Sequence, residues 1–266
     1  MQPLDGCPAP PPAPTDTPEP TTPHLALAVW PPSNPNLPDS YLAASQGQHR
    51  IAPELAARGV LAYTDPGDLV VDPACGAGSV LVEAIRNGRR AIGIEADPRL
   101  AALATANISH AREQGAPSRA AVLEGRPSQL PRLLTKAAAV LNPDGGQGKL
   151  RRHPAGSTRL ILTAATTSEL PELLPVLQRV LAPGGFLLLA LEQPDGEARS
   201  GLGATVTAAE EAGLHYWQHV IALRTRPGAH DSDARPVLLH TDVLAFRKPT
   251  PARNAQATQS RAAVSA

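Results

Sequence analysis

A strand, a glycine-bearing loop and a helix follow one another between residues 69 and 86, and this segment constrains the fold more than any other. Leu69 to Asp72 is apolar and β-branched, as expected of a strand buried on both faces. Ser79 to Arg86 carries its apolar residues on one helical face. In the loop between them, Gly76 and Gly78 let the backbone approach a ligand closely, and the new helix presents free amide groups to an anion. The segment predicts one strand–helix unit of a parallel α/β sheet.

The same alternation of strands and helices continues along the chain. Further strands are expected at residues 91–95, 121–124, 159–163, 186–191, 219–224 and 237–246, and further helices at 98–114, 170–181 and 204–212. Only Thr225 to Pro236 joins the last two strands, and this segment is too poor in helical pattern to make the crossover that parallel neighbours require. If adjacent, these strands must form an antiparallel hairpin. The sequence therefore predicts a doubly wound, mostly parallel α/β sheet of seven strands with an antiparallel last strand.

Prolines crowd the beginning of the chain. The sequence has 30 prolines but only 3% aromatic residues, and its first stretch cannot bury enough apolar surface to offset the entropy of ordering it. We expect a disordered tail at residues 1–25 and a second, Ala/Ser/Thr/Gln-rich one at 249–266. Residues 26–248 are expected to form one domain, with an exposed loop at about 142–157 where turn residues cluster.

The cysteines and the charged residues indicate the compartment in which the protein works and the partners it has. Cys7 and Cys75 lie in a predicted tail and in the glycine-bearing loop, so they offer no pair that would cross-link the fold, which favours a reducing cytoplasm. No apolar run is long enough to span a membrane, so no membrane partner is expected, and no metal site is predicted. Acidic and basic residues number 24 each, which counts against a DNA or RNA substrate. The oligomeric state is left open.

An acidic residue ends the second strand. Glu95 lies a little over twenty residues after Asp72, where a carboxylate accepts hydrogen bonds from both ribose hydroxyls of a nucleoside cofactor. A dinucleotide site would place a third small residue three positions after Gly78, but Leu81 stands there. A nicotinamide-dependent enzyme is therefore the poorer fit.

Two motifs carry a resemblance to a known family. The run from Asp72 to Gly78, Asp-Pro-Ala-Cys-Gly-Ala-Gly, is similar to the Asp-Pro-x-Cys-Gly-x-Gly motif of bacterial DNA methylases of the amino-methylating (N4/N6) type. Leu181 to Gly185 resembles the Leu-x-Pro-Gly-Gly of class I methyltransferases, and the similarity continues at 218–223 and 240–249. The resemblance implies a class I methyltransferase fold with S-adenosyl-L-methionine as cofactor. It implies that the methionine end and the ribose are held by the following residues: Asp72, Pro73, Ala74, Cys75, Gly76 and Gly78 for the first, Glu95 and Ala96 for the second.

The chain departs from this family after the third strand. Gly125-Arg126-Pro127 stands where the family reads Gly-Asp-Ala, whose aspartate accepts a hydrogen bond from the adenine amino group. An arginine has no acceptor. Either Arg126 stacks on the adenine face, or Glu124 takes over the acceptor role, or Arg126 is a solvated loop residue.

A second departure concerns the catalytic motif. Amino-methylases carry (Asp, Asn or Ser)-Pro-Pro-(Tyr or Phe) after the fourth strand, where the aromatic ring holds the flipped base. Here the motif position reads Thr163-Ala164-Ala165-Thr166, without prolines or aromatic. Trp30-Pro31-Pro32-Ser33 is no substitute, because it is expected at the edge of the disordered tail. Trp30, Tyr41 or Tyr63 is a candidate for a stacking ring.

Two functional hypotheses follow from these departures. The chain is a methyltransferase related to DNA amino-methylases, with a degraded catalytic motif and a nucleic acid or another substrate, or it is an inactive homologue that serves as a cofactor-binding or regulatory protein. In the family a His-Pro segment packs near the cofactor. Its counterpart is the segment from Gln48 to Pro53, where His49 is expected to be a surface histidine preceding a helix.

Overall fold

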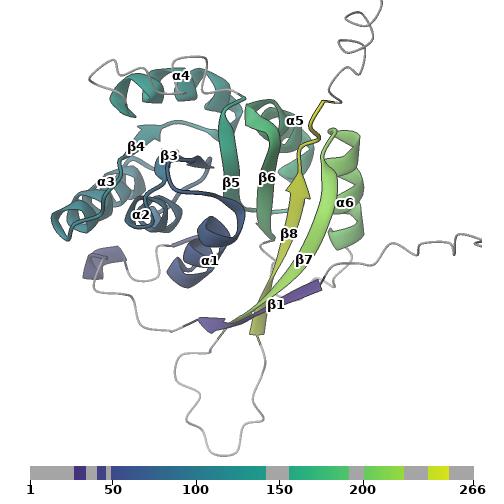
Figure 1. Cartoon of the computed structure of the whole chain (residues 1–266), viewed down its shortest axis with the longest axis horizontal. Helices are drawn as coiled ribbons and strands as arrows, with labels where there is room; N and C mark the ends of the chain where they lie inside the picture. Colours follow the sequence, from purple (N-terminus) through teal and green to yellow (C-terminus); the bar gives the residue numbers. More distant parts are fainter. Residues whose placement is uncertain are drawn as a thin grey trace, which may run out of the picture.

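The structure is a computed structural model, and it describes residues 27–33, 41–45, 49–141, 156–191, 201–224 and 239–251. These residues form one eight-stranded sheet with helices on both faces (Figure 1). The strands are β1 Leu27–Ser33, β2 Leu69–Asp72, β3 Arg90–Glu95, β4 Ala120–Glu124, β5 Thr158–Ala165, β6 Leu181–Leu191, β7 His215–Arg224 and β8 Leu239–Arg247. The α-helices are α1 Pro53–Tyr63, α2 Ser79–Arg86, α3 Pro98–Glu113, α4 Leu130–Leu141, α5 Leu170–Val180 and α6 Gly201–Glu211, and 3-10 turns lie at η1 Ala43–Ser45 and η2 Pro127–Gln129.

The strand order is β1-β7-β8-β6-β5-β2-β3-β4. β8 runs antiparallel to both of its neighbours, β6 and β7, whereas the other strand pairs are parallel. The predicted α/β fold class and the antiparallel pairing of the last two strands are therefore confirmed. Most of the predicted loop at 142–157 and both predicted tails, apart from residues 249–251, lie outside the described residues.

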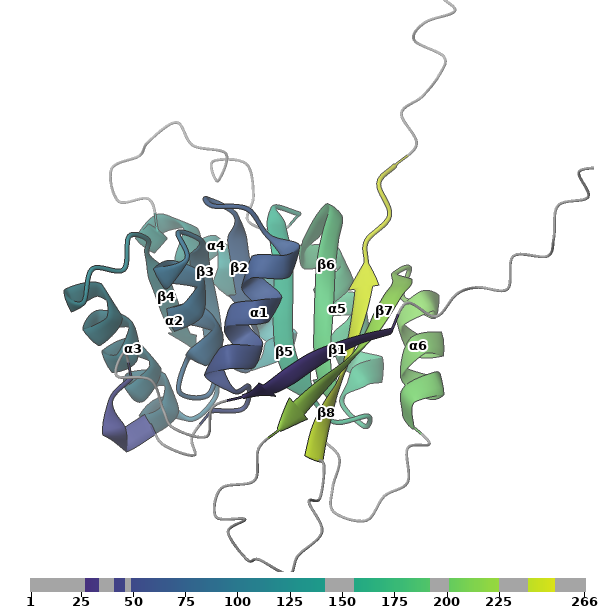
Figure 2. The ribbon, with the colours of Figure 1, turned by 60° about the horizontal axis from the view of Figure 1, so that its bottom comes forward.

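Successive residues of the central strands pack alternately into two separate hydrophobic cores, one on each face of the sheet. Val70 packs in the core with residues of α1, α2 and α3, and Val71 packs in the core with residues of α4 and α5. Figure 2 shows the arrangement of these helices about the sheet. Leu160 and Ile161 of β5 divide between the two cores in the same way. Because helices cover both faces, every position of β2 is buried, which explains its uninterrupted apolar sequence.

The sheet has an eighth strand, so the expected number of seven strands is corrected. β1 pairs parallel with β7 at the sheet edge and contains Trp30-Pro31-Pro32-Ser33, which the sequence had suggested to lie outside the sheet. Ala28 and Trp30 pack toward the core, while Leu27 and Val29 are more than half exposed. Proline is tolerated here because one side of an edge strand needs no ladder hydrogen bonds.

Two helices were missing from the sequence prediction. α1 begins with Pro53 at its first turn, where the absent amide is not needed, and buries Leu55 and Val60. α4 follows the turn η2 and buries Leu130 and Leu134. None of the helices within the described ranges is both long enough and apolar enough to cross a bilayer.

Candidate cofactor and substrate pocket

The loop after β2 adopts a backbone that its glycines permit. Gly76 and Gly78 have φ angles of 53° and 85°, in the left-handed region. A Cβ atom on Gly78 would lie 3.0 Å from Cβ of Ala104 in α3, so this helix packs directly against the loop. Asn107, fully buried in α3, donates a hydrogen bond to the Ala77 carbonyl at 2.9 Å and accepts one from the Leu42 amide at 2.9 Å. The loop is thus held in place from α3.

Asp72 sits at the end of β2 and is only 2% exposed. One carboxylate oxygen accepts a hydrogen bond from the Ala74 amide at 3.1 Å, and the Thr163 side chain supplies a second hydrogen bond. Burial raises the pKa of Asp72 to about 7, although these hydrogen bonds and the positive charge of Arg50 act in the opposite direction. At neutral pH this carboxyl group therefore lies close to its titration midpoint.

Glu95 holds the loop through its side chain. Its Oε2 accepts a hydrogen bond from the Gly76 amide at 2.8 Å, and its Oε1 accepts from the amides of Ala96 and Asp97 at 2.8 and 3.0 Å. A carboxylate offers about four acceptor positions. Three are used, so Glu95 retains room for one further donor.

A pocket of about 420 Å³ opens at the carboxyl ends of the parallel strands. This volume lies in the range of small-molecule and cofactor sites. The pocket brings together predicted cofactor residues, two residues of the motif position, and side chains from η2 and α5. Its lining consists of Arg50, Pro73, Ala74, Glu95, Ala96, Arg126, Pro127, Ser128, Thr163, Ala164, Glu169, Glu172 and Leu173.

Several predicted site residues do not line this pocket. Asp72, Gly76 and Gly78 form the loop behind its wall. Cys75 is 2% exposed in the core beneath α2, and its Sγ would lie only 2.8 Å from a Cβ on Gly93. Its side chain therefore faces away from the pocket. Glu124 is exposed at the end of β4, beside Glu95 in the strand register.

The motif position belongs to a strand. Thr163, Ala164 and Ala165 are buried in β5, and Thr166 follows it, whereas the sequence had suggested that the strand ends at Thr163. Thr166 donates hydrogen bonds from its amide and its hydroxyl to Oε2 of Glu169, both at 2.9 Å. These hydrogen bonds, led by that of the Thr166 amide, lower the pKa of Glu169.

Three charged pocket residues escaped the sequence analysis: Arg50, Glu169 and Glu172. A signal existed for one of them, because Thr166 and Glu169 have the Thr-x-x-Glu spacing that is typical of a helix start. Arg50 and Glu172 carry no local signal, since only the packing of α1 and α5 against the sheet brings them to the pocket.

These features place the chain among known folds. Residues 27–106, less than a third of the chain, match a family of the N6/N4 type described as DNA methylase. Comparison with curated proteins finds no match. Solved structures match this arrangement over most of the chain, with TM-scores of 0.50 to 0.52. The chain has a class I methyltransferase fold.

Three solved structures illustrate this fold. A precorrin 8W decarboxylase from Methanobacterium thermoautotrophicum is 18% identical with a TM-score of 0.52, and the match covers 79% of this chain and 97% of that one. The magnesium protoporphyrin IX methyltransferase of Synechocystis PCC 6803 is 14% identical with a TM-score of 0.50, covering 74% and 77%. The 4+2 cyclase SpnF is 19% identical with a TM-score of 0.50, covering 74% and 80%. At these identities the likeness shows the fold alone.

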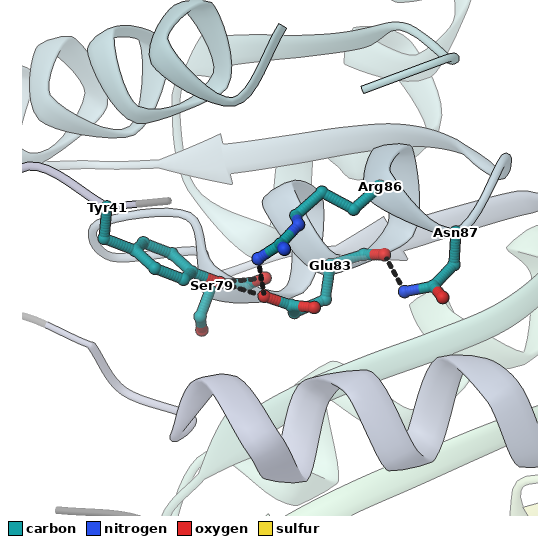
Figure 3. A network of polar contacts seen from close by, with 5 residues as sticks. All are labelled: Tyr41, Ser79, Glu83, Arg86 and Asn87. Atoms are coloured by element: carbon teal, nitrogen blue, oxygen red, sulfur yellow. Dashed lines mark hydrogen bonds and ion pairs between the residues drawn. The ribbon is translucent and has the colours of Figure 1, made fainter. Parts of the chain in front are cut away.

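No aromatic ring lines the pocket of this methyltransferase fold. The sequence has two Trp, three Tyr and two Phe, and all seven lie among the described residues. Tyr41 donates hydrogen bonds to Glu83 Oε1 at 2.9 Å and to the Ser79 carbonyl at 3.3 Å (Figure 3). Tyr63 packs against Phe186 with the rings tilted by 59° and their centroids 5.0 Å apart. Trp30 lies in β1, so none of the three predicted candidates for a stacking ring reaches the pocket.

His49 differs from its expected surface position. Both of its ring nitrogens are buried, and neither has a hydrogen-bond partner among the described residues. Its ring meets Tyr41 edge to face, with centroids 4.9 Å apart. Burial lowers the pKa of His49 to about 4, so the ring is neutral at physiological pH. His49 does not line the pocket, and within the described ranges no cluster of side chains suits a metal ion.

Proposed function

We propose that this chain binds S-adenosyl-L-methionine in the pocket at the ends of β2, β3 and β5 and transfers its methyl group. One observation supports this most strongly: the glycine loop and Glu95 are joined by a hydrogen bond at the pocket wall, on a sheet with the methyltransferase strand order. Glu95 and Ala96 would hold the ribose. Pro73 and Ala74 would face the methionine end, with Asp72 behind them. A single ribose hydroxyl suffices to fill the remaining acceptor position of Glu95.

The pocket's own residues limit the chemistry. When bound, the cofactor supplies an electrophilic methyl group on a sulfonium, so the protein needs only to position a nucleophile in line with it. Thr163 and Ala164 border the place where that nucleophile would sit. The Ala164 side chain offers no hydrogen bond, and the Thr163 hydroxyl is engaged with the Ala164 carbonyl, at 3.4 Å, and with Asp72. The chain therefore positions its acceptor less firmly than the family motif does.

The absence of aromatic residues from the pocket bears on the substrate. Amino-methylation of a flipped base relies on a ring that stacks on it, and the lining offers only two planar guanidinium groups, those of Arg50 and Arg126, in place of a ring. We infer that transfer to DNA or RNA is slow, or that the acceptor belongs to another class. An inactive homologue that retains the cofactor is the second candidate, favoured by the replacement of the whole motif at 163–166.

Cofactor binding separates these proposals from a nicotinamide enzyme. S-adenosylhomocysteine should raise the melting temperature of the full chain, because a ligand that binds only the folded state stabilises it. NADH should not. A shift with NADH and none with millimolar S-adenosylhomocysteine would reverse the assignment.

The role of Glu95 needs a test that its structural hydrogen bonds do not confound. Replacing Glu95 by Ala should weaken binding, but it also leaves the Gly76 amide unpaired. The 2′-deoxy and 3′-deoxy analogues of S-adenosylhomocysteine therefore form the second arm. The wild type should bind at least one of them more weakly than the parent compound, and Glu95→Ala should not discriminate. Equal affinities of the wild type for all three ligands would mean that Glu95 only holds the loop and makes no contact with the ribose.

Methyl transfer is tested with labelled cofactor and purified protein. Transfer to genomic DNA or bulk RNA should be slow, and restoring Ser-Pro-Pro-Tyr at 163–166 should raise it. Rapid transfer by the wild type would refute the claim of a degraded motif. If the cofactor binds tightly but neither protein labels a nucleic acid, the amino-methylase assignment fails while the cofactor assignment stands.

A further inference from the structure

The adenine end of the proposed cofactor site lacks the acceptor that the related family provides. Arg126 stands at that position and has only donors. The alternative acceptor, Glu124, is exposed at the end of β4 and does not line the pocket. Among the pocket-lining side chains of residues 126–128, only the Ser128 hydroxyl could accept from the exocyclic amine of an adenine placed beside Ala96, and a carboxylate at this end of the pocket must come from another element.

A carboxylate from α5 reaches the same end of the pocket. Glu172 lies in the first turn of α5 and lines the pocket together with Arg126, Pro127 and Ser128. α5 packs directly against η2, which carries two of these residues. The next residue, Leu173, is buried in the core on that side of the sheet and fixes the rotation of the helix. Glu172 is thereby held at the pocket by the fold.

Glu95 holds the loop after β2, and of the two other glutamates that line the pocket, Glu169 and Glu172, only Glu172 has a carboxylate with no hydrogen bond. Glu169 accepts two hydrogen bonds from Thr166 on a single oxygen. The positive charge of Arg50 acts to lower the pKa of Glu169 and also that of Asp72. Glu172 makes no hydrogen bond or ion pair with any residue in the described part of the chain, and neither does Arg126 through its side chain. Two opposite charges thus line one end of the pocket without pairing with each other.

We propose that Glu172 accepts a hydrogen bond from the exocyclic amine of the cofactor's adenine and so selects 6-amino over 6-oxo purines. This inference rests on the proposed function, since it assigns a residue to the same cofactor. Arg126 lies across the base in this arrangement. A 6-oxo purine presents a carbonyl to the Glu172 carboxylate where the amine would stand, so two acceptors face each other and binding is weakened.

Calorimetric titration of the full chain with two ligands tests the assignment. S-adenosylhomocysteine carries the 6-amino group, and S-inosylhomocysteine carries a 6-oxo group in its place. The wild type should prefer the first by about tenfold to a hundredfold, the range of one hydrogen bond to a charged group. Glu172→Ala should lose that preference mainly by weaker binding of the 6-amino ligand. Glu172→Gln should bind the 6-oxo ligand better than the wild type does, because its amide can donate to the carbonyl.

Two matched variants complete the design. Glu169→Ala removes the neighbouring carboxylate one turn earlier and should leave the ratio of the two affinities unchanged. Glu124→Ala should also leave it unchanged, and a collapse of the ratio in this variant instead of Glu172→Ala would overturn the assignment. An unchanged ratio in Glu172→Ala would overturn it as well, with cofactor binding intact. If the wild type binds neither ligand, the proposed function itself fails.

Discussion

Replacing Asp72 by Asn tests whether burial governs the carboxyl group behind the cofactor loop. Asp72 is 2% exposed, and burial raises its pKa from 3.8 to about 7. Between these two values the folded protein holds a proton that the unfolded chain has released. The free energy of unfolding therefore falls as the pH rises through this window. Asparagine has no such proton, so Asp72→Asn should lack this slope.

The size of the effect follows from the width of the window. At pH 7 the folded carboxyl is half protonated, but from about pH 5 to about pH 6 it is mostly protonated while the unfolded one is mostly ionised. Each pH unit in that range changes the unfolding free energy by about 1.4 kcal/mol. Relative to the wild type, Asp72→Asn should therefore gain about 2.3 kcal/mol between pH 5 and pH 7, and the gain should level off near pH 8.

His49 titrates in an overlapping range with the opposite sign. Burial lowers its pKa from 6.5 to about 4, so the unfolded chain binds the extra proton and stability rises with pH in that window. Both proteins carry His49, so its contribution cancels in the difference between them. Urea unfolding at several pH values measures that difference, with the exposed Asp65→Asn as control. A difference independent of pH would refute the argument, because it would mean that folded Asp72 stays ionised throughout.

Two further changes test how the loop is held. Asn107→Leu leaves the buried Ala77 carbonyl and the Leu42 amide without their partner, and should lower the unfolding free energy in urea by about 3 kcal/mol. Asn107→Asp, which keeps the acceptor for Leu42, should lose less. Gly78→Ala places a side chain at a φ angle of 85° and 3.0 Å from Cβ of Ala104. It should cost about 2 kcal/mol in the same assay, and an unchanged midpoint would show that the loop relaxes freely.

Elements with a complete local signal were predictable from the sequence. The bounds of α2, Ser79 to Arg86, follow from its apolar face and from the Asn-Gly stop behind it. The antiparallel pairing of β7 and β8 was reached by exclusion, because the segment between them cannot supply a crossover. The alternation of strands and helices, together with the missing crossover between β7 and β8, was enough to predict the fold class.

Features set by distant contacts were not predictable. β1 pairs with β7 nearly two hundred residues later, and its two prolines argue locally against a strand. Cys75 lies in a cofactor motif, yet its side chain packs beside Gly93 of the neighbouring strand. No local sequence pattern predicts this contact. Glu172 looks like any exposed helix residue in the sequence. Only the packing of α5 on η2 gives it a place in the pocket.

The loss of the catalytic motif has a structural counterpart in β5. Ala164 and Ala165 continue the strand and pair in register with Ala190 and Leu191 of β6. In a parallel ladder alternate residues bond to a given neighbour, so at least one of these two amides donates to β6. Prolines at both positions would remove that donor and end the strand early. Restoring Ser-Pro-Pro-Tyr should therefore lower the unfolding free energy by about 1 kcal/mol or more even if it raises activity. Stability unchanged in the restored variant would mean that β5 already ends before Ala164 in solution, with the pocket edge open.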